Sequence, residues 1–395
     1  MHLAIDAVGI REGGGLTILR GFVEYLSLRQ SGDRYTVFVG EEGIQIPRFS
    51  ACDVRIAPFG SGRVSRIAWQ QFGLPVVASR IKADVVLAFV NSGSFFSPLP
   101  QCVYCQQILP FEPEFVQKFD LSIRLQLRVQ KMLMVGSAAV SDLVVVQTRA
   151  MGDRLSSGCG GQRIRKRVVI SPPGVALNSG IGEVSQCVRS VSERCRHPTL
   201  LYVSSLGVHK NHPNLIKAFG LLLKKYPEAS VVLTIGSKSQ VYPDLMAEID
   251  SLVEGSPRPQ SIFRIGTVTP TEVSFLLRHC DVAVFPSVVE SFGLPLIEAM
   301  AAGVPVSASD RPYAREVLGE AGSFFDPFEP LSIEAAIDSV IRSPSMRRDM
   351  VNRGLKRAKA FCGDVSYSHL YDIIAGIVRS SSGSRIDDSL GAARG

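Results

Sequence analysis

The strongest constraint on the fold is a pattern in which short apolar runs rich in β-branched residues alternate with segments long enough for a helix. In the first half of the chain these runs are residues 2–7, 35–39, 85–89, 101–104 and 143–146. Continuous apolar strands of this length are typical of a parallel sheet with helices on both faces, because neither face then meets water. The first half therefore predicts a doubly wound α/β sheet.

The same pattern starts again after the break Ser171-Pro-Pro-Gly-Val175, with strands predicted at 200–204, 231–235, 262–265, 282–285, 304–307 and 323–325. A chain of 395 residues is also long for a single hydrophobic core. We therefore predict an α/β protein with two doubly wound Rossmann-like domains, residues 1–175 and 176–364, facing a central cleft.

Three further segments carry predictions about organisation. The polar residues 177–196 show little periodicity and indicate a linker or an excursion at a domain edge, whereas residues 365–379 have the amphipathic pattern of a helix that packs back across the first domain. The small polar residues 380–395 predict a disordered tail.

Composition narrows the class of protein. No apolar run approaches the roughly 20 residues that a bilayer crossing needs, and the eight scattered cysteines are typical of reduced thiols, so we expect a cytoplasmic protein. The net charge of +7 indicates an anionic partner: a nucleotide diphosphate, an acidic membrane surface or nucleic acid. We expect no nucleic acid, because the basic segment 163–167 has no interleaved aromatic side chains.

One turn in the second half has the features of a phosphate-binding site. A buried strand ends at 285, and Pro295 stands where a helix begins, so the backbone N–H groups of Phe292, Gly293 and Leu294 would face a ligand at the helix N-terminus. Glu298, one turn into the helix, is placed to accept ribose hydroxyls, and Glu290 lies before the turn, nearer a sugar. The alternative for Glu298 is a first-turn glutamate that is favoured by the helix dipole, and the alternative for Glu290 is a solvated loop charge.

Lys210 follows another predicted strand and its loop, where its ammonium group would neutralise a phosphate. Ser205 and His209 either share these phosphate contacts or are ordinary loop residues.

In the first half, Gly14 and Gly15 follow a strand and precede a helix predicted at 16–28, so their backbone can approach a ligand closely. These glycines do not fit the dinucleotide spacing, which argues against NAD. Gln107, beside Gln106 after another strand, is a weaker donor-site candidate, the alternative being a polar loop that caps the strand end.

The segment Glu290-Ser-Phe-Gly-Leu-Pro-Leu-Ile-Glu298-Ala-Met-Ala-Ala-Gly-Val-Pro-Val306 resembles the signature of glycosyltransferase family 4, two glutamates separated by seven residues. Residues 142–151, 172–175 and 201–211 resemble further landmarks of this family, so the resemblance spans residues 1–379. It implies the two-Rossmann (GT-B) fold, Glu290 at the hydroxyls of the donor sugar, Glu298 on the nucleotide ribose and the amides of 292–294 near the phosphates. Lys210 would grip the diphosphate.

Two positions depart from the family pattern. Ser205 stands where an arginine is common, and Gln106-Gln107 stands where a histidine is common. The family places a glycine loop such as 13–15 against the donor phosphate or the acceptor.

The resemblance implies a retaining glycosyltransferase with Glu290 and Lys210 as its catalytic residues. It would move a hexosyl unit, with mannose as the working hypothesis, from a nucleotide diphosphate sugar to a hydroxyl of a glycan or lipid-linked glycan in cell-surface polysaccharide synthesis. We expect no cofactor besides this donor, and no metal ion because no Asp-x-Asp pair stands in a suitable loop.

Residues 115–140 predict one long helix in which Arg124, Arg128 and Lys131 alternate with apolar residues. Such a helix either lies on an anionic membrane, which family members that extend lipid-linked sugars do with this region, or simply covers its own sheet. The first alternative places the protein at the inner face of the membrane. Two other functions stay open: a nucleotide-sugar epimerase on the same fold, and a non-catalytic membrane-associated scaffold.

Overall fold

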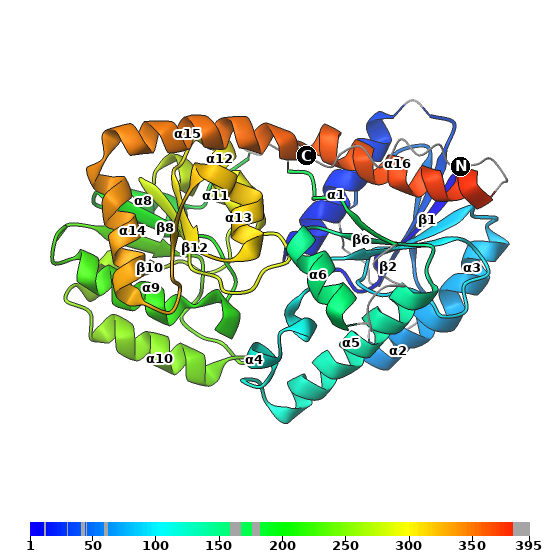
Figure 1. The fold of residues 1–395 in the computed structure, drawn as a ribbon, viewed down its shortest axis with the longest axis horizontal. Coiled ribbons are helices and arrows are strands. Elements are labelled where there is room, and N and C mark those ends of the chain that lie inside the picture. Colours follow the sequence, from blue (N-terminus) through cyan, green and yellow to red (C-terminus); the bar gives the residue numbers. More distant parts are fainter. Residues whose placement is uncertain are drawn as a thin grey trace. The chain divides into compact units, whose positions relative to one another are not determined.

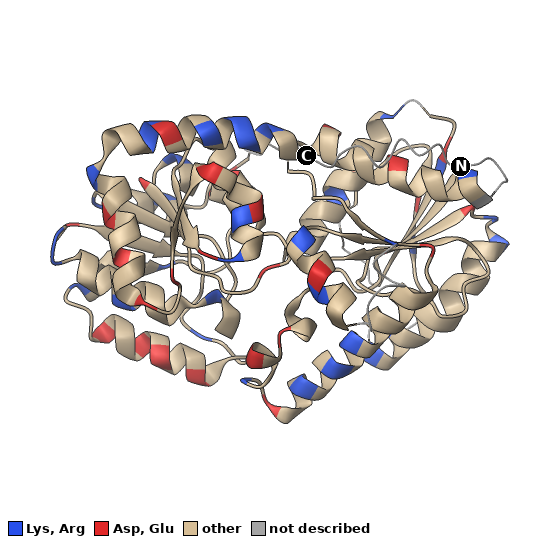
Figure 2. Cartoon of the chain, viewed as in Figure 1, with Lys and Arg blue, Asp and Glu red and all other residues tan. Residues whose placement is uncertain are grey.

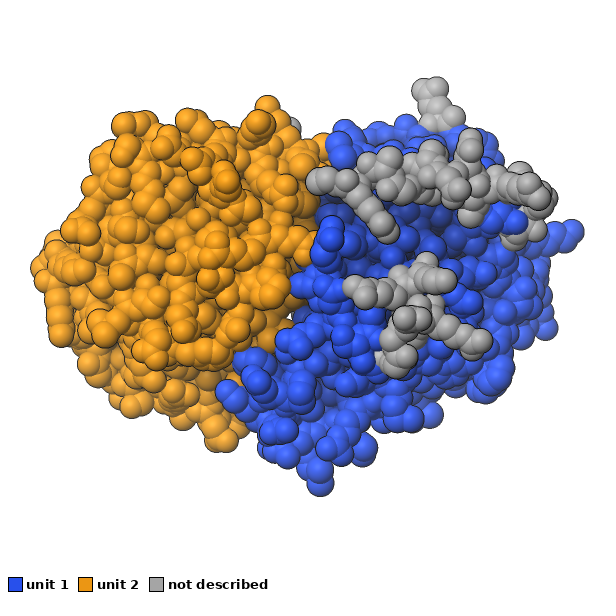
Figure 3. Space-filling model, in the orientation of Figure 1, with its two compact units in different colours: residues 1–174, 363–395 blue, residues 175–362 orange. Residues whose placement is uncertain are grey.

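A computed structural model describes residues 1–11, 13–29, 31–40, 44, 46–58, 62–158, 167–175 and 182–381 of the chain. The chain forms two compact units, which Figure 3 colours separately. Unit 1 combines residues 1–174 with the segment that begins at Gly363, and unit 2 is Val175–Cys362. Each unit has its own parallel sheet with helices between most successive strands, so the predicted α/β class with two Rossmann-like units is confirmed (Figure 1).

The sheet of unit 1 has the strand order β3-β2-β1-β4-β5-β6-β7, and all its neighbouring strands are parallel. Ile5 at the centre of the sheet pairs with Val37 on one side and Leu87 on the other. The strands are β1 (His2–Asp6), β2 (Arg34–Val39), β3 (Cys52–Ile56), β4 (Val85–Ala88), β5 (Gln101–Cys105), β6 (Leu143–Val146) and β7 (Val168–Ile170).

The sheet of unit 2 has the order β10-β9-β8-β11-β12-β13, again with parallel pairs only. This is the strand order of a dinucleotide-binding Rossmann fold. The strands are β8 (Thr199–Tyr202), β9 (Ser230–Leu233), β10 (Ile262–Arg264), β11 (Val282–Phe285), β12 (Val306–Ser309) and β13 (Gly322–Phe325).

Helices cover both sheets. In unit 1 they are α1 (Gly13–Leu28), α2 (Arg63–Ala68), a π-helical turn (Trp69–Gly73), α3 (Leu74–Arg80), a 3₁₀ turn (Leu109–Phe111), α4 (Pro113–Val116), α5 (Leu121–Val140), α6 (Arg149–Gly158) and α16 (Gly363–Ser381). In unit 2 they are α8 (Gln186–Arg194), α9 (His212–Leu222), α10 (Pro243–Glu254), α11 (Pro270–Arg278), α12 (Leu294–Ala301), α13 (Pro312–Leu318), α14 (Pro330–Arg342), α15 (Pro344–Ala358) and 3₁₀ turns at Val208–Lys210, Pro259–Ser261, Gly319–Ala321 and Lys359–Phe361.

Some element boundaries differ from the sequence prediction. The helix predicted at 115–140 is two helices, α4 and α5, separated by residues 117–120. The segment predicted as a linker contains α8, whose first turn is capped by the Ser185 side chain and whose Val188 and Val191 are buried. Part of that segment, 177–181, lies outside the described residues, as do 163–166 of the basic stretch and 382–395 of the predicted tail.

The C-terminal helix α16 belongs to unit 1 and packs on α1 and β4. Tyr367 contacts the rings of Phe22 and Tyr25, with centroid separations of 5.9 and 6.3 Å, and its hydroxyl donates to the carbonyl of Gly174 at 2.8 Å. The last helix thus completes the core of the unit that the chain's first residues begin.

Candidate active site

Strand order places a ligand-binding edge in unit 2. In a doubly wound sheet, ligands bind at the carboxyl ends of the two strands where the order of connections reverses. In unit 2 these strands are β8 and β11, which lie side by side. The loop 203–211 leaves the end of β8 and the turn 286–293 leaves the end of β11, so the two segments singled out from the sequence meet at this edge.

The two loops are fixed to each other by hydrogen bonds. The Tyr202 hydroxyl lies 2.8 Å from both the Lys210 carbonyl and the Ser287 hydroxyl, and Val288 N–H donates to the His209 carbonyl at 2.8 Å. Asn211 adopts a left-handed conformation with φ 60°, and its amide donates to the Pro327 carbonyl at 2.6 Å. Asparagine tolerates this backbone region better than most residues. The loop geometry is therefore set before any ligand arrives.

Lys210 and Glu290 form an ion pair at this edge. The Lys210 Nζ lies 2.5 Å from Glu290 Oε1, and the two side chains are only 14% and 13% exposed. The structure therefore brings together a cation and an acid that are 80 residues apart in the sequence. A buried pair of this kind provides a charged group for a phosphate and an acceptor for sugar hydroxyls in one place.

The N-terminus of α12 opens at the same turn. Gly293 precedes the helix with φ 91°, a backbone region that favours glycine, and no side chain caps the helix start. Phe292 is buried and packs on Phe361, with ring centroids 5.5 Å apart. This contact anchors the turn to the core of unit 2. Leu294 is the first residue of α12, so the three predicted amides all belong to this turn and helix start.

Glu298 lies one turn into α12 and is half-buried. Burial raises the pKa of its carboxyl group to about 7. Its carboxylate makes no hydrogen bond or ion pair within the described ranges. A ligand that donates hydrogen bonds to this carboxylate would stabilise the ionised form.

Ser205 and His209 differ in accessibility. Ser205 is exposed, whereas His209 is half-buried, and burial followed by the charge of Lys210 lowers the pKa of its imidazole to about 4. His209 is therefore neutral at pH 7, so its ring contributes a hydrogen-bonding group and no positive charge.

His212 escaped the sequence prediction. It is buried, its Nε2 lies 3.0 Å from the Ser204 hydroxyl, and its ring packs on Tyr202 at 4.9 Å. The one sequence signal for His212 is its position directly after Lys210-Asn211, the segment predicted to contact a phosphate.

In unit 1, Gly14 and Gly15 lie in the first turn of α1 instead of preceding the helix. Gly15 neighbours Gln106: a Cβ placed on Gly15 would lie 3.4 Å from Gln106 Oε1. The Gln107 side chain, predicted from the sequence, is held elsewhere, because its Oε1 accepts a hydrogen bond of 2.5 Å from Gln130 on α5. Gln106, and not Gln107, therefore faces the glycine turn.

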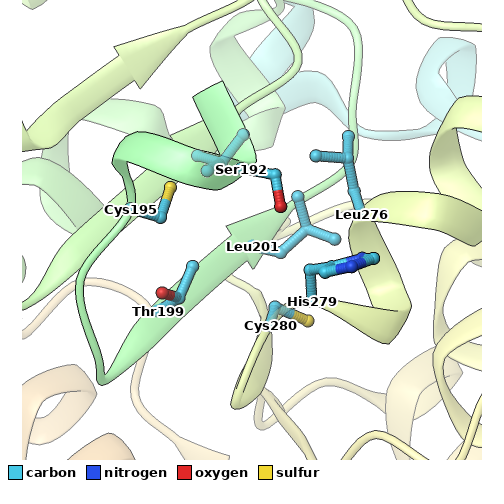
Figure 4. A pocket seen from close by; sticks show the side chains of 8 residues that line it. Ser192, Cys195, Thr199, Leu201, Leu276, His279 and Cys280 are labelled. Carbon is cyan, nitrogen blue, oxygen red and sulfur yellow. The ribbon is translucent and has the colours of Figure 1, made fainter. Parts of the chain in front are cut away.

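A small cavity lies in unit 2 apart from these residues (Figure 4). Ser192, Leu201, His279 and two cysteines, Cys195 and Cys280, are among its lining residues. Its volume of about 10 Å³ is room for at most one water molecule. Within the described part of the chain, no three His, Cys, Asp or Glu side chains gather as metal ligands. None of the described helices combines the length and apolarity that a bilayer crossing needs.

Comparison with known proteins shows a family likeness for most of unit 2. Residues 189–357 match the family model described as "Glycosyl transferases group 1". The O-antigen chain mannosyltransferase B of Escherichia coli is 33% identical over 165 residues, 41% of each chain. The D-inositol 3-phosphate glycosyltransferase of Paenarthrobacter aurescens (strain TC1) is 26% identical over 223 residues, 55% of this chain and 53% of that protein. The chain thus spans about half the length of these curated relatives.

Solved structures extend the likeness to the whole fold. The Anabaena protein Alr3699/HepE, in a crystal structure with UDP and glucose, has a TM-score of 0.73 and 17% identity, and the match covers 95% of this chain and 99% of that one. At this identity the likeness shows the fold, which is the two-sheet fold expected from the sequence.

Proposed function

We propose that the whole chain is a retaining, metal-independent hexosyltransferase, a proposal supported by the match of residues 189–357 to the family model of the group 1 glycosyl transferases. It uses a nucleotide diphosphate sugar as donor and a hydroxyl of a glycan or lipid-linked glycan as acceptor. The ion pair of Lys210 and Glu290 beside the uncapped N-terminus of α12 is the observation that carries the proposal.

The chemistry follows from where charge develops. When the bond between the sugar and the diphosphate breaks, negative charge accumulates on the leaving phosphate. Lys210 lies at this edge with its ammonium group, and the amides of the α12 turn add the positive end of a helix dipole. The leaving phosphate, stabilised in this way, accepts the proton of the incoming hydroxyl on the same face of the sugar, so the anomeric configuration is retained.

Four residues besides Lys210 have roles in donor binding under this proposal. Glu298 accepts the two ribose hydroxyls, which supplies the donors that its carboxylate lacks among the described residues. Glu290 accepts hydroxyls of the donor sugar while Lys210 turns to the phosphate. Neutral His209 and exposed Ser205 complete the phosphate contacts in place of a second cation.

The donor sugar rests on the relatives. The mannosyltransferase from Escherichia coli supports mannose, whereas the Anabaena structure contains UDP and glucose. The relation to an O-antigen enzyme also supports a role in cell-surface polysaccharide synthesis.

The decisive experiment is a panel of UDP- and GDP-linked hexoses, with binding measured by thermal shift and products by NMR. We expect one donor to raise the Tm, and its sugar to appear on an acceptor glycan with the donor's anomeric configuration and with undiminished rate in EDTA. Free sugar released without any acceptor would support the epimerase instead. Absence of nucleotide-sugar binding across the panel would leave the scaffold function.

A contact with an anionic membrane is a second part of the proposal. Along α5, Leu121, Leu125, Val129 and Met132 are 78%, 60%, 41% and 72% exposed, and their spacing places them on one face of the helix. Lysines and arginines recur along the same helix (Figure 2). The opposite side, including Leu127 and Met134, is buried, so α5 covers its own sheet and still presents an apolar face outward.

Binding to lipid vesicles tests this contact. We expect the chain to sediment with vesicles that contain phosphatidylglycerol, and less with pure phosphatidylcholine, because basic side chains accompany the apolar face. Leu125→Gln together with Met132→Gln should lower vesicle affinity about tenfold or more, since each side chain contributes roughly 1.5 kcal/mol or more when buried. The control, Val241→Gln, changes a valine in unit 2 that is 61% exposed. Equal sedimentation of all variants would exclude this face.

A further inference from the structure

Unit 1 has its own ligand-binding edge. The order of connections in its sheet reverses between β1 and β4, which are neighbours, so the carboxyl ends of these strands form the position where doubly wound sheets bind ligands. Gly9 lies shortly after β1, Gly13 begins α1, and Asn91 lies just beyond β4. Two polar groups at this edge have no partner within the described ranges.

The first is Arg66, on α2. It is half-buried, its Nε is completely buried without a hydrogen-bond partner, and its guanidinium makes no ion pair with any described residue. A Cβ placed on Gly9 would lie 3.8 Å from Arg66 Nη1, so the guanidinium borders the connection between β1 and α1. Burial and then the charges of Arg11 and Arg63 lower the pKa of Arg66, which shows that further positive charge surrounds it.

A partly buried guanidinium among like charges is unfavourable unless an anion accompanies it. The acidic side chain at the end of β1 does not serve this purpose. Asp6 is buried and accepts hydrogen bonds from Val8 N at 3.3 Å and Trp69 Nε1 at 3.2 Å. Burial also raises the pKa of Asp6 to about 6.

The second group is the side-chain oxygen of Gln106. Its amide nitrogen donates to the Phe89 carbonyl at 2.8 Å and its backbone N–H donates to Asn91 Oδ1 at 2.6 Å, so the side chain is held in one orientation. The remaining atom, Oε1, is buried and accepts no hydrogen bond from the described residues. It lies against Gly15, where a Cβ would be 3.4 Å from this oxygen, so a side chain at position 15 would contact it. A ligand hydroxyl would satisfy it.

We propose that unit 1 binds an acceptor that carries a phosphate group as well as hydroxyls, with Arg66 holding the phosphate and Gln106 Oε1 accepting one of the hydroxyls. This inference rests on the proposed glycosyltransferase function and names the chemical class of its acceptor. The donor diphosphate has separate groups in unit 2, Lys210 and the α12 turn. The phosphate is that of a sugar phosphate or of a lipid-linked diphosphate sugar, which share this chemistry.

Calorimetric titration without any donor tests the site directly. The probes are glucose 6-phosphate, a glucosyl polyprenyl diphosphate in detergent micelles, and glucose with empty micelles as their uncharged counterparts. We expect one phosphate-bearing probe to bind at least about tenfold more tightly than its counterpart, because a charged hydrogen bond contributes roughly 1.5 kcal/mol or more. The probe that shows this preference identifies the source of the phosphate.

Variants locate the binding. Arg66→Gln should remove the preference for the phosphate-bearing probe, and Arg66→Lys, which keeps the charge without the planar fork, should retain part of it. Arg80→Gln is the control, since Arg80 is an exposed arginine at the end of α3 in the same unit. Gln106→Leu should weaken the uncharged and phosphorylated sugars equally. Full preference in Arg66→Lys and Arg66→Gln would overturn the proposal.

Binding of nucleotide separates this site from the donor site. We expect the Arg66 variants to bind UDP and GDP as the unaltered chain does, whereas Lys210→Gln should weaken nucleotide binding and leave the phosphate preference unchanged. Loss of nucleotide affinity in Arg66→Gln with no change toward the sugar phosphates would assign Arg66 to the donor and refute the acceptor site. Absence of nucleotide binding in the unaltered chain would instead refute the proposed function.

Discussion

At the scale of single residues, the two glutamates of the signature differ in their electrostatic surroundings. Glu290 has the Lys210 ammonium at 2.5 Å, whereas Glu298 has no such partner among the described residues, and burial raises its pKa to about 7. One carboxylate is therefore compensated before the donor binds, and the other depends on the ligand for compensation. Sequence spacing alone does not distinguish these two states.

The state of Glu298 predicts a pH-dependent nucleotide affinity. Ribose hydroxyls donate to the ionised carboxylate, so binding favours ionisation and lowers its pKa. The affinity for nucleoside diphosphate should therefore rise with pH through about 7 and level off above it, with at most a tenfold change per pH unit. Calorimetry in buffers of different ionisation enthalpy should show proton release on binding at pH 6.5.

The matched variant for this prediction is Glu298→Gln, which should bind more weakly at pH 8 and lose the pH dependence between pH 6 and 8. An unchanged pH profile in that variant would mean that another group titrates. A constant affinity of the unaltered chain over this range would contradict the prediction, because no group would then titrate on binding.

The ion pair predicts different kinetic effects for its two members. Lys210→Gln should weaken donor use and slow turnover, because the leaving phosphate loses its cation, with a decrease in kcat/KM of about 100-fold. Glu290→Gln should mainly lower kcat, since the donor sugar loses its orienting acceptor while the nucleotide contacts remain. Lys217→Gln, an exposed lysine on the following helix α9, should match the unaltered chain. Full kcat/KM in Lys210→Gln for every active donor would exclude its assigned role.

At the scale of elements, α12 depends on the backbone of one residue. Gly293 has φ 91°, and a Cβ there would lie 3.1 Å from Leu296 Cδ1. The turn therefore combines a conformation that costs other residues about 1–2 kcal/mol with a crowded side-chain position. Glycine allows both the helix start and a close approach by phosphate oxygens.

Alanine at this position should lower stability and nucleotide affinity together. We expect Gly293→Ala to reduce the free energy of unfolding by about 1–2 kcal/mol and to weaken nucleotide binding. Gly376→Ala is the control: Gly376 lies within α16 with open space around its Cβ position, and alanine should stabilise that helix by up to about 1 kcal/mol. Denaturant unfolding measures both changes, and an unaltered Gly293→Ala transition would show that the turn adapts without strain.

The sequence predicted the central strands of both sheets, because most of them contain a run of buried apolar residues. The edge strand β3 mixes polar with apolar side chains that are half-buried or exposed, and the edge strand β7 is apolar but only three half-buried residues long. Helix α8 was missed because only two of its residues, Val188 and Val191, are buried.

In the candidate site, the motif residues of unit 2 were found because they are consecutive in sequence. Arg66 was not predicted, and Gln106 was ranked behind its neighbour Gln107. Both residues stand out only because polar atoms of their side chains lack hydrogen-bond partners among the described residues. That information exists only once β1, β4 and β5 lie side by side. Spacing identifies contiguous motifs, whereas unpaired groups become visible in the folded sheet.

At the scale of the whole molecule, unit 1 is discontinuous in sequence: it begins at Met1 and is completed by α16. Tyr367 is the main contact, because its ring packs on Phe22 and Tyr25 and a Cβ on Gly21 would collide with it. The described groups proposed to bind the nucleotide, by contrast, all lie within unit 2. Stability of one unit and nucleotide binding by the other should therefore respond differently to changes in α16.

Tyr367→Ala tests this separation. Removing the buried ring should destabilise unit 1 by about 3–5 kcal/mol, the cost of deleting a large aromatic side chain from a core. Hydrogen exchange should accelerate in β1, β4 and α1 and stay unchanged in β8 and β11, with nucleotide affinity preserved below the unfolding temperature. Val365→Ala, at a position on the same helix that is 55% exposed, should change neither. If exchange accelerated equally in both sheets, the two units would unfold as one cooperative structure, and α16 would stabilise the donor site as much as the core that it covers.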